Sequence, residues 1–404
     1  MWKTLRSVLR FRRFEFDPVL RRLGRCANVE DLRALAKRQV PRGVFDYIDG
    51  AAEDEKTQQR NCDAFHRLEF KPRVLRDVSK VRLDSKLLGK TLPMPLVLAP
   101  TGFSRASNSQ GELAVARAAQ RAGLPYSLST LSTRSIEDVA RVSSGPKWFQ
   151  VYAWKDKGLV KELLERAMAA NYEAILITVD TSVLGRRERD VRSGFTLPPK
   201  VGLSTLLDGI LHPQWTMDFL RAEPISFANV AGRGVGDGSD AISLADYINS
   251  QFDSGLNWET VDWMRSIWKG PVVLKGIQTV EDAEIAASEG IDAIALSNHG
   301  GRQLDGAPPP LELVGPVADK VGGRVEILCD GGVRRGSDIV KAVALGATAC
   351  MTGRAYLYGL AAGGEVGVDL VLEWFGESMR RTLSLVGCSS FEQCNSSIVR
   401  WRTE

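Results

Sequence analysis

Eight short apolar runs, separated by helical patterns, restrict the folds that this chain can adopt. The runs are PLVLAP (95–100), LPYSLST (124–130), KWFQVYA (147–153), AILITVD (174–180), PVVLKG (271–276), AIALSNHG (293–300), VEILCDGG (325–332) and ATACMTGRA (347–355). Stretches between them, such as GELAVARAAQRAG and KGLVKELLERAMAAN, repeat apolar residues with the period of a helix. Strands apolar on both faces that alternate with helices indicate a parallel sheet. Eight such units predict a closed (β/α)8 barrel, the TIM-barrel fold, rather than an open doubly wound sheet.

Two segments lie outside this repeat. Residues 30–75, N-terminal to the barrel, read as helices and are expected to cap it. The connection 181–270, after the fourth strand, is an insertion far longer than a usual strand-to-helix loop. It holds an amphipathic stretch, LSTLLDGILHPQWTMDFL, which is interpreted as a lid in preference to an oligomer contact or a membrane foot. It also holds GRGVGDGSD, which reads as a flexible loop. The chain therefore divides into an arm (1–29), a barrel domain (30–390) and a C-terminal tail (391–404).

Composition excludes several function classes. Lys and Arg number 53 against 49 Asp and Glu, and a net charge of +4 is too mild to indicate a nucleic-acid partner. The six cysteines form no C-x-x-C pair, so neither a zinc site nor a disulfide framework is expected, and a reducing cytoplasmic setting fits. No apolar run reaches the roughly 18 residues of a spanning helix, and no secretory signal is evident.

The first 25 residues form a basic arm interleaved with aromatic residues. Eight Lys and Arg side chains stand there against Glu15 and Asp17, with Trp2 and three phenylalanines between them. Such a segment could lie on an anionic membrane surface, on the inner face of the cell membrane, or could pack as an extended arm on a neighbouring subunit or on the barrel.

Polar residues gather where the predicted strands end. Because a barrel enzyme keeps its chemistry at the C-terminal ends of its strands, this regularity is the strongest sign of catalysis in the sequence. The residues are Thr101, Gly102, Ser129, Thr130, Gln150, Tyr152, Thr178, Asp180, Lys275, Ser297, His299, Asp330, Gly353 and Arg354.

The last two strands carry a phosphate signal. DGGVRRGSD (330–338) and TGRAY (352–356) place glycines and the arginines Arg334 and Arg354 after strands seven and eight, where barrels commonly bind phosphate. Lys275, ending strand five, is suited to a negative charge that develops on a cofactor ring.

His299 is the candidate for proton transfer. A single histidine is more often structural, but this one follows an apolar strand and is flanked by glycines in SNHGGRQLDG. Arg302 stands three residues away to hold an anion, and Asp180 at another strand end could orient the imidazole as a base. Metal ligation is not expected, because no second histidine stands at ligand spacing.

These motifs resemble the FMN-dependent L-2-hydroxy-acid oxidases and dehydrogenases over residues 30 to 390. The resemblance rests on SNHGGRQLDG, LKG at Lys275, TVD at Asp180, LGRRERD at Arg187, DGGVRRG with GRA, and FDYIDGAAEDE at Tyr47. It implies FMN as cofactor, His299 as base and Asp180 as its partner, with Tyr152 at the substrate hydroxyl. Tyr47, Arg187 and Arg302 would bind the substrate carboxylate, and the implied FMN-binding residues are Thr101, Gly102, Ser129, Gln150, Thr178, Lys275, Ser297, Asp330, Gly332, Arg334, Gly353 and Arg354.

Two positions refine the expected reaction. Gly102 stands where many oxidases of the family have alanine, which resembles dehydrogenases that react poorly with oxygen and favours a quinone or another carrier as acceptor. Leu131 stands where glycolate oxidase has tryptophan, so L-lactate is preferred over glycolate. The chain looks most like bacterial respiratory L-lactate dehydrogenases, and the family resemblance implies a homo-oligomer, commonly a tetramer.

Other interpretations stay open at this point. An oxygen-using oxidase or a mandelate-type dehydrogenase would keep the same residues. An FMN barrel that modifies a peptide would need a wider mouth, and a non-catalytic binding barrel would have no reason to keep His299, Arg302 and Lys275 together.

Overall fold

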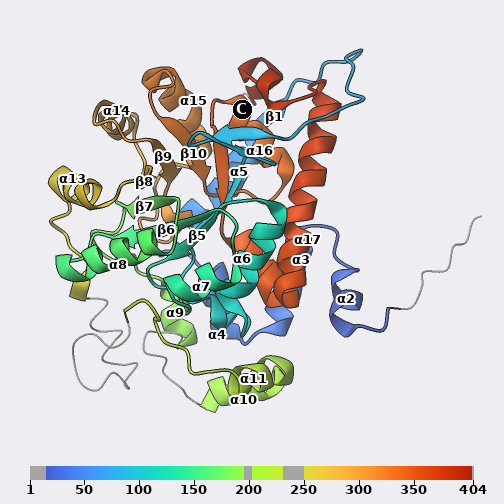
Figure 1. Cartoon of the computed structure of the whole chain (residues 1–404). Coiled ribbons are helices and arrows are strands. Elements are labelled where there is room, and N and C mark those ends of the chain that lie inside the picture. The colour runs from blue at the N-terminus through green and yellow to red at the C-terminus, as the bar shows by residue number, and fades with distance from the viewer. Residues whose placement is uncertain (1–14, 195–202, 231–249, 403–404) are drawn as a thin grey trace, which may run out of the picture.

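A closed parallel barrel of eight strands forms the centre of the molecule (Figure 1). The computed structural model describes residues 15–194, 203–230 and 250–402. The barrel strands are β4 (Leu96–Leu98), β5 (Tyr126–Ser129), β6 (Lys147–Tyr152), β7 (Ala174–Thr178), β8 (Val272–Ile277), β9 (Ala293–Ser297), β10 (Glu326–Asp330) and β11 (Ala349–Thr352). They pair in chain order, and β11 closes the barrel against β4. The predicted fold and all eight predicted strands are confirmed.

Alternating side chains of the strands build two separate cores. Val97, Leu176, Val273, Leu328 and Met351 point inward and fill the barrel. Their neighbours along each strand point outward into a larger core shared with the surrounding helices. Burial on both faces explains why the strands read as continuous apolar runs.

The outer helices follow the strands as the alternation predicts. They are α6 (Gly111–Ala122), α7 (Ile136–Val142), α8 (Lys157–Ala169), α13 (Trp258–Ile267), α14 (Val280–Ser288), α15 (Pro310–Val321), α16 (Gly336–Ala344) and α17 (Arg354–Val386). The last is long and apolar enough to span a membrane by composition alone, but 72% of its most apolar window is buried. Its backbone also breaks at Gly363 and Gly364, so it is a kinked helix packed on the barrel.

The segment before the barrel supplies the predicted helical cap. It comprises α2 (Pro18–Leu23), α3 (Val29–Gln39), α4 (Arg42–Asp49) and α5 (Lys56–Arg67). Two small sheets accompany it, β1 (Leu68–Phe70) paired antiparallel with β12 (Val399–Trp401), and the hairpin β2 (Ser85–Leu87) with β3 (Lys90–Leu92). Short 3-10 turns complete the elements, η1 (Ser104–Ala106), η2 (His299–Gly301), η3 (Phe391–Gln393) and η4 (Ser396–Ile398).

In the part of the insertion after β7 that the structure describes, α9 (Glu188–Ser193), α10 (Leu203–Leu211) and α11 (Pro213–Arg221) precede α13. Figure 1 places them with α4 at one end of the barrel, opposite β1. Asp208 of α10 accepts a hydrogen bond from the backbone N–H of Arg42 at 2.6 Å, and the Trp215 indole of α11 donates to the carbonyl of Ala106 at 2.8 Å. The glycine-rich stretch GRGVGDGSD and most of the basic arm, residues 1–14, lie outside the described residues.

Candidate active site

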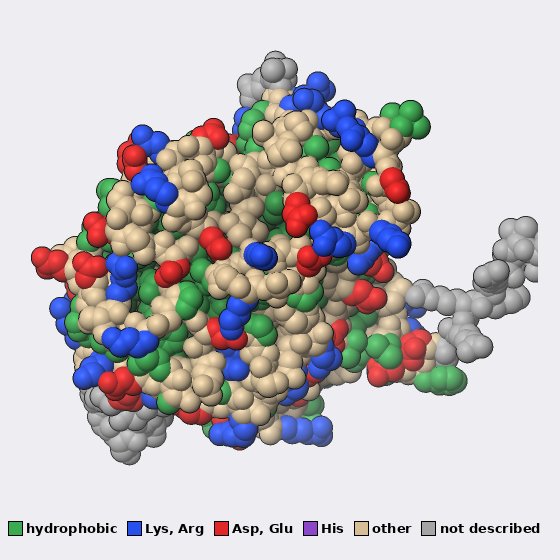
Figure 2. All heavy atoms as spheres, turned by 45° about the horizontal axis from the view of Figure 1, so that its top comes forward, with side chains coloured by type: hydrophobic (Ala, Val, Ile, Leu, Met, Phe, Trp, Pro, Cys, Tyr) green, Lys and Arg blue, Asp and Glu red, His purple; other side chains and the backbone are tan. Residues whose placement is uncertain are grey.

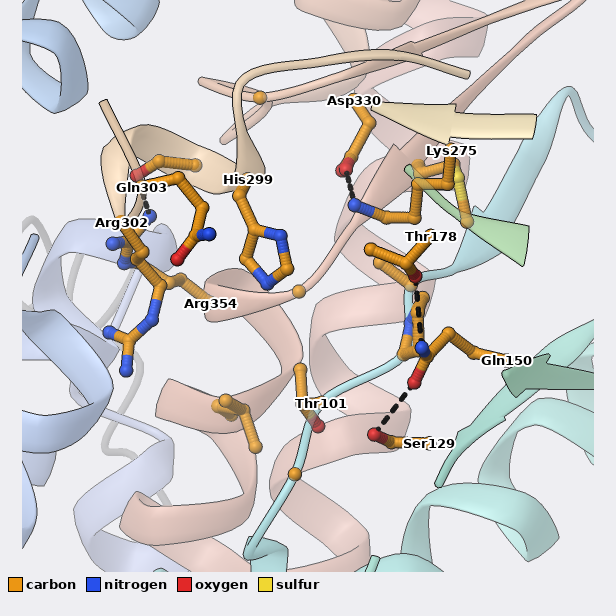
Figure 3. Close-up of a pocket in the computed structure, with 18 of the residues that line it drawn as sticks. Thr101, Ser129, Gln150, Thr178, Lys275, His299, Arg302, Gln303, Asp330 and Arg354 are labelled. Atoms are coloured by element: carbon orange, nitrogen blue, oxygen red, sulfur yellow. Dashed lines mark hydrogen bonds and ion pairs between the residues drawn. The ribbon is translucent and has the colours of Figure 1, made fainter. Parts of the chain in front are cut away.

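The C-terminal ends of the barrel strands surround one cavity (Figure 3). Sixteen of the predicted residues line it: Tyr47, Thr101, Gly102, Ser129, Gln150, Tyr152, Thr178, Arg187, Lys275, His299, Arg302, Asp330, Gly332, Arg334, Gly353 and Arg354. The three others, Thr130, Asp180 and Ser297, are not among the lining residues but bond to residues that are. The structure therefore brings together every residue that the sequence singled out for the site.

A buried ion pair marks one side of the cavity. The Lys275 ammonium lies 2.7 Å from Oδ2 of Asp330, and both groups bond to the Ser297 hydroxyl, at 3.2 and 2.8 Å. Burial alone would lower the pKa of Lys275, but the charges of Asp330 and Asp180 outweigh it and raise this pKa. Lys275 is thus a fixed positive charge at the floor of the site.

His299 and Asp180 form a second pair. Nδ1 of His299 lies 3.0 Å from Oδ1 of Asp180, whose side chain is only 2% exposed. His299 has a φ of 57°, an uncommon left-handed conformation that aims its ring into the cavity. With Nδ1 held by the carboxylate, Nε2 is the nitrogen left to face a substrate.

Gly276 allows Asp180 to reach this position. Its φ is 115°, and a Cβ built there would lie 2.7 Å from both Cβ and Cγ of Asp180. Only glycine accommodates that backbone conformation and that approach together. The LKG motif therefore serves two parts of the site, Lys275 directly and His299 through Asp180.

Three polar side chains form a row of hydrogen bonds along the wall of the cavity. The amide of Gln150 donates to the Thr178 hydroxyl at 2.9 Å, and its carbonyl oxygen accepts from the Ser129 hydroxyl at 2.9 Å. All three are buried. This row of hydrogen bonds fixes the orientation of the Gln150 amide and presents polar edges toward a planar ligand.

Arginines gather on the opposite side. Arg302 donates to the carbonyls of Tyr47 and Gly50 at 2.8 Å, and its guanidinium lies over the Tyr47 ring at 5.1 Å. Burial and the neighbouring charges of Arg187 and Arg354 lower the pKa of Arg302. Such crowding of like charge in a cavity indicates an anion-binding site.

These residues fit FMN. Among the described residues, the guanidinium groups of Arg334 and Arg354 bond only to backbone carbonyls and have no carboxylate partner, so their charge is available to a phosphate. A Cβ at Gly353 would meet only ordinary contacts, so the backbone there is open to a ligand. The polar wall of Gln150 and the charge of Lys275 suit an isoalloxazine ring that becomes anionic on reduction. No group of three or more His, Cys, Asp or Glu residues in the described chain is placed to hold a metal.

Several residues of the site were missed by the sequence analysis. Gln303 lines the cavity and donates to the carbonyls of Asp180 and Val183, at 3.0 and 2.8 Å. Gln303 stands in SNHGGRQLDG, the motif that holds His299 and Arg302, so its place in this motif could have indicated that it belongs to the site. Phe252 and Leu184, which also line the cavity, come from the insertion and carry no local signal.

Arg189 is a further omission. It bonds to Asp49 at 2.7 Å and also to Glu55, and thereby holds α9 against α4. The LGRRERD motif drew attention to Arg187, but spacing alone does not tell which of its arginines faces the cavity.

The fold and this arrangement define a flavin-binding barrel oxidoreductase. The FMN-dependent dehydrogenase family model matches residues 36–401, and the chain belongs to that family. It is 46% identical over 392 residues to a Mycobacterium tuberculosis protein named "Putative L-lactate dehydrogenase", covering 97% of this chain and 93% of that protein. It is 43% identical to (S)-mandelate dehydrogenase of Pseudomonas putida, over 89% of this chain and 90% of the relative. The crystal structure of the monotopic membrane protein (S)-mandelate dehydrogenase superposes with a TM-score of 0.89 at 42% identity, over 93% of this chain and 99% of that one.

Proposed function

We propose that this FMN-dependent enzyme oxidises L-2-hydroxy acids to 2-oxo acids, with L-lactate as the preferred substrate. The observation that carries the proposal is the His299–Asp180 pair, which faces the cavity between the Lys275 side and the arginine side (Figure 3). A base beside an anion-binding cluster matches a substrate that bears a hydroxyl next to a carboxylate.

Different side chains of the cavity bind the substrate and transfer its proton. Arg302, Arg187 and Tyr47 bind the carboxylate and fix the substrate in one orientation. Nε2 of His299 removes a proton from the hydroxy acid, and the carboxylate of Asp180 stabilises the imidazolium that results. FMN, when bound, accepts the two electrons that leave the substrate.

Tyr152 is positioned for the substrate hydroxyl. Burial and the charge of Asp180 raise the pKa of its phenol, so it stays protonated and can donate a hydrogen bond. Its ring is fixed by an edge contact with Phe252, at 5.3 Å between centroids.

Part of the remaining wall of the cavity is apolar. Leu131, Leu184 and Phe252 line it without adding a charge, which suits the methyl group of lactate and also admits larger apolar side chains. Such a wall is compatible with lactate and with mandelate, the substrates in the names of relatives of this family.

Two helices of the insertion expose apolar side chains that suit a membrane surface, and a membrane-bound setting supports a quinone as electron acceptor. Helices α10 and α11 expose Leu207, Ile210, Leu211, Met217 and Leu220 at 53, 72, 76, 48 and 71%. Among the residues of these helices whose side chains are described, none lines the cavity, which does not support the favoured lid. By contrast, Figure 2 shows a face near the opposite end of the barrel where charges of both signs are scattered among apolar side chains.

We therefore assign α10–α11 as a foot that rests on a membrane, and place the enzyme on the cytoplasmic side as a homo-oligomer. A pair of helices with a contiguous apolar face binds lipid through the area it buries. The similarity to a monotopic membrane protein supports this assignment.

The first experiment mixes the purified holoenzyme with L-lactate without air and follows flavin absorbance near 450 nm, the usual region for oxidised flavin. We expect rapid bleaching, slow return in air and fast return with a quinone. Fast return in air would indicate an oxidase. Bleaching with mandelate but not with L-lactate would make mandelate the preferred substrate. No bleaching with any 2-hydroxy acid would refute the proposed reaction and favour an enzyme that modifies a peptide.

The base assignment is tested by His299→Gln. The variant should keep bound FMN and its visible spectrum but lose flavin reduction by at least about a thousand-fold. Near-normal reduction would refute the role of His299.

The foot is tested by flotation with anionic phospholipid vesicles. Ile210→Ser combined with Leu211→Ser should shift the protein from the vesicle fraction to the soluble fraction. Leu385→Ser, a control that removes a leucine exposed at 69% on α17, should float like the wild type. Equal flotation of all three proteins would contradict the assignment.

A further inference from the structure

A second groove lies beside the membrane foot, between α2, α11, the kink of α17 and the loop after η1. Its volume is about 400 Å³, within the range of small-molecule sites. Gln214, Trp215 and Asp218 of α11 form one wall, and Ala361 to Val366 of α17 form another. The break at Gly363 and Gly364 turns the helix and opens the groove.

The lining suits a flat molecule with polar edges. Val19, Leu20, Val40 and the Ala361–Ala362 pair provide apolar surface. The carboxamide side chains of Asn108, Gln110 and Gln214 reach the same space and can donate to carbonyl oxygens.

The ring of Trp215 stiffens the wall. It stacks on Phe219 at 4.8 Å between centroids, and its indole N–H is taken by the carbonyl of Ala106. The charged side chains of the lining are Arg22 and the carboxylates Asp17, Asp218 and Glu365, the last of which is paired with Arg117 and Arg121. A carboxylate ligand would therefore meet more negative than positive charge here, unlike in the active-site cavity. The groove therefore favours a neutral ligand over a second hydroxy acid.

This groove adjoins the active-site cavity. On α17, Leu357 lines the cavity and Ala361 lines the groove, four residues or about 6 Å apart along the helix axis. On the other wall, Thr101 and Gly102 line the cavity, while Ser107 to Gln110 of the same loop line the groove. Side chains of α17 and of this loop therefore separate the two pockets, and electrons would cross them without direct contact between donor and acceptor.

We propose that this groove binds the ring of a membrane quinone, which enters along the foot and reoxidises the cofactor; the proposal rests on the proposed function above. The reduced cofactor gives up two electrons and one proton, and His299 releases the second proton that left the substrate. The quinone takes both electrons, and its two carbonyl oxygens take up two protons from water at the open side of the groove to form the quinol. Substrate oxidation and quinone reduction would then use separate pockets.

A photoreactive azido-quinone tests the site directly. After illumination of the holoenzyme in detergent, mass spectrometry should find the label on peptides that contain residues 107–110 or 214–218. Oxalate, a dicarboxylate that competes for the substrate cavity, should not reduce the labelling. Labelling of the peptides that hold Leu184 or Phe252, abolished by oxalate, would overturn the proposal and place the quinone in the substrate cavity.

A filled groove gives an independent readout. Gln214 is exposed on the rim, so Gln214→Trp should fold normally, raise the KM for a short-chain ubiquinone analogue at least ten-fold and leave anaerobic flavin reduction by lactate unchanged. Arg221→Trp, at an exposed position on the same helix but outside this groove and outside the apolar residues of the foot, is the matched control and should keep the wild-type KM. Equal quinone kinetics in both variants would refute the groove, whereas failure of flavin reduction in the wild type would refute the proposed function instead.

Discussion

Substitution of Gly276 by alanine tests whether the site depends on the fit between two neighbouring strand ends. The new Cβ would stand 2.7 Å from Cβ and Cγ of Asp180 and 3.0 Å from its backbone nitrogen. Carbon atoms pack at about 3.5–4.0 Å, so Asp180 must retreat by about 1 Å. A displacement of that size in a catalytic group costs on the order of 100-fold in rate, equivalent to about 2.7 kcal/mol.

The backbone adds a separate cost. Alanine at a φ of 115° is strained by about 1–3 kcal/mol, which lowers stability but does not by itself slow catalysis. Gly323→Ala is the matched control, because Gly323 has a φ of 77° with nothing within 4 Å of the built Cβ.

Stopped-flow flavin reduction by L-lactate, together with thermal melting, separates the two effects. We expect both variants to melt lower than the wild type and only Gly276→Ala to reduce its flavin slowly, with FMN retained in both. If Gly276→Ala reduced flavin as fast as Gly323→Ala, the contact with Asp180 would not matter and the reasoning would fail.

Three further predictions follow from the charges of the site and its supports. Asp180→Asn removes a charge next to the imidazole worth about 4 kcal/mol at an effective dielectric of 20, so flavin reduction should slow about 1,000-fold; stopped-flow rates within ten-fold of the wild type would contradict this. Lys275→Met leaves Asp330 buried without its cation and should cost about 3–5 kcal/mol in urea unfolding, while the double variant with Asp330→Asn should regain stability but not rapid flavin reduction. Burial opposes ionisation of Asp49, but hydrogen bonds and charges of Arg33 and Arg189 hold its pKa below the usual range. Its contribution to stability is therefore present above about pH 4 and lost as the pH falls through the folded-state pKa, so Asp49→Asn should melt lower than the wild type at pH 7 and approach it in acid.

The barrel could be predicted because its strands are buried on both sides. An apolar run such as AILITVD carries the same signal whatever surrounds it, and eight of them at regular spacing admit few folds. Polar residues at the ends of those runs then pointed to the catalytic rim, since the position of a residue at a strand end fixes where it lies in a barrel.

Long-range contacts made by the insertion could not be predicted in this way. Phe252 reaches the cavity because Trp154 and Phe252 pair in an isolated β-bridge, a contact between positions almost a hundred residues apart. The function of 203–220 was also left open, because amphipathic periodicity shows that one face is buried without telling whether protein or lipid covers it. Gly276 shows the same limit, since the need for glycine arises from a side chain on another strand.

Helix α4 connects the proposed membrane foot with the candidate active site. Its N-cap, Pro41, offers no side-chain acceptor, and Asp208 of α10 accepts the hydrogen bond of the first helical N–H instead. At the other end of α4, Asp49 is held by Arg189 of α9. The insertion therefore grips both ends of the helix that carries Tyr47. Because a helix fixed at both ends moves as one body, a shift of α10 would be transmitted through α4 to Tyr47 and to the arginine side of the cavity, so the proposed foot and the candidate active site are mechanically joined.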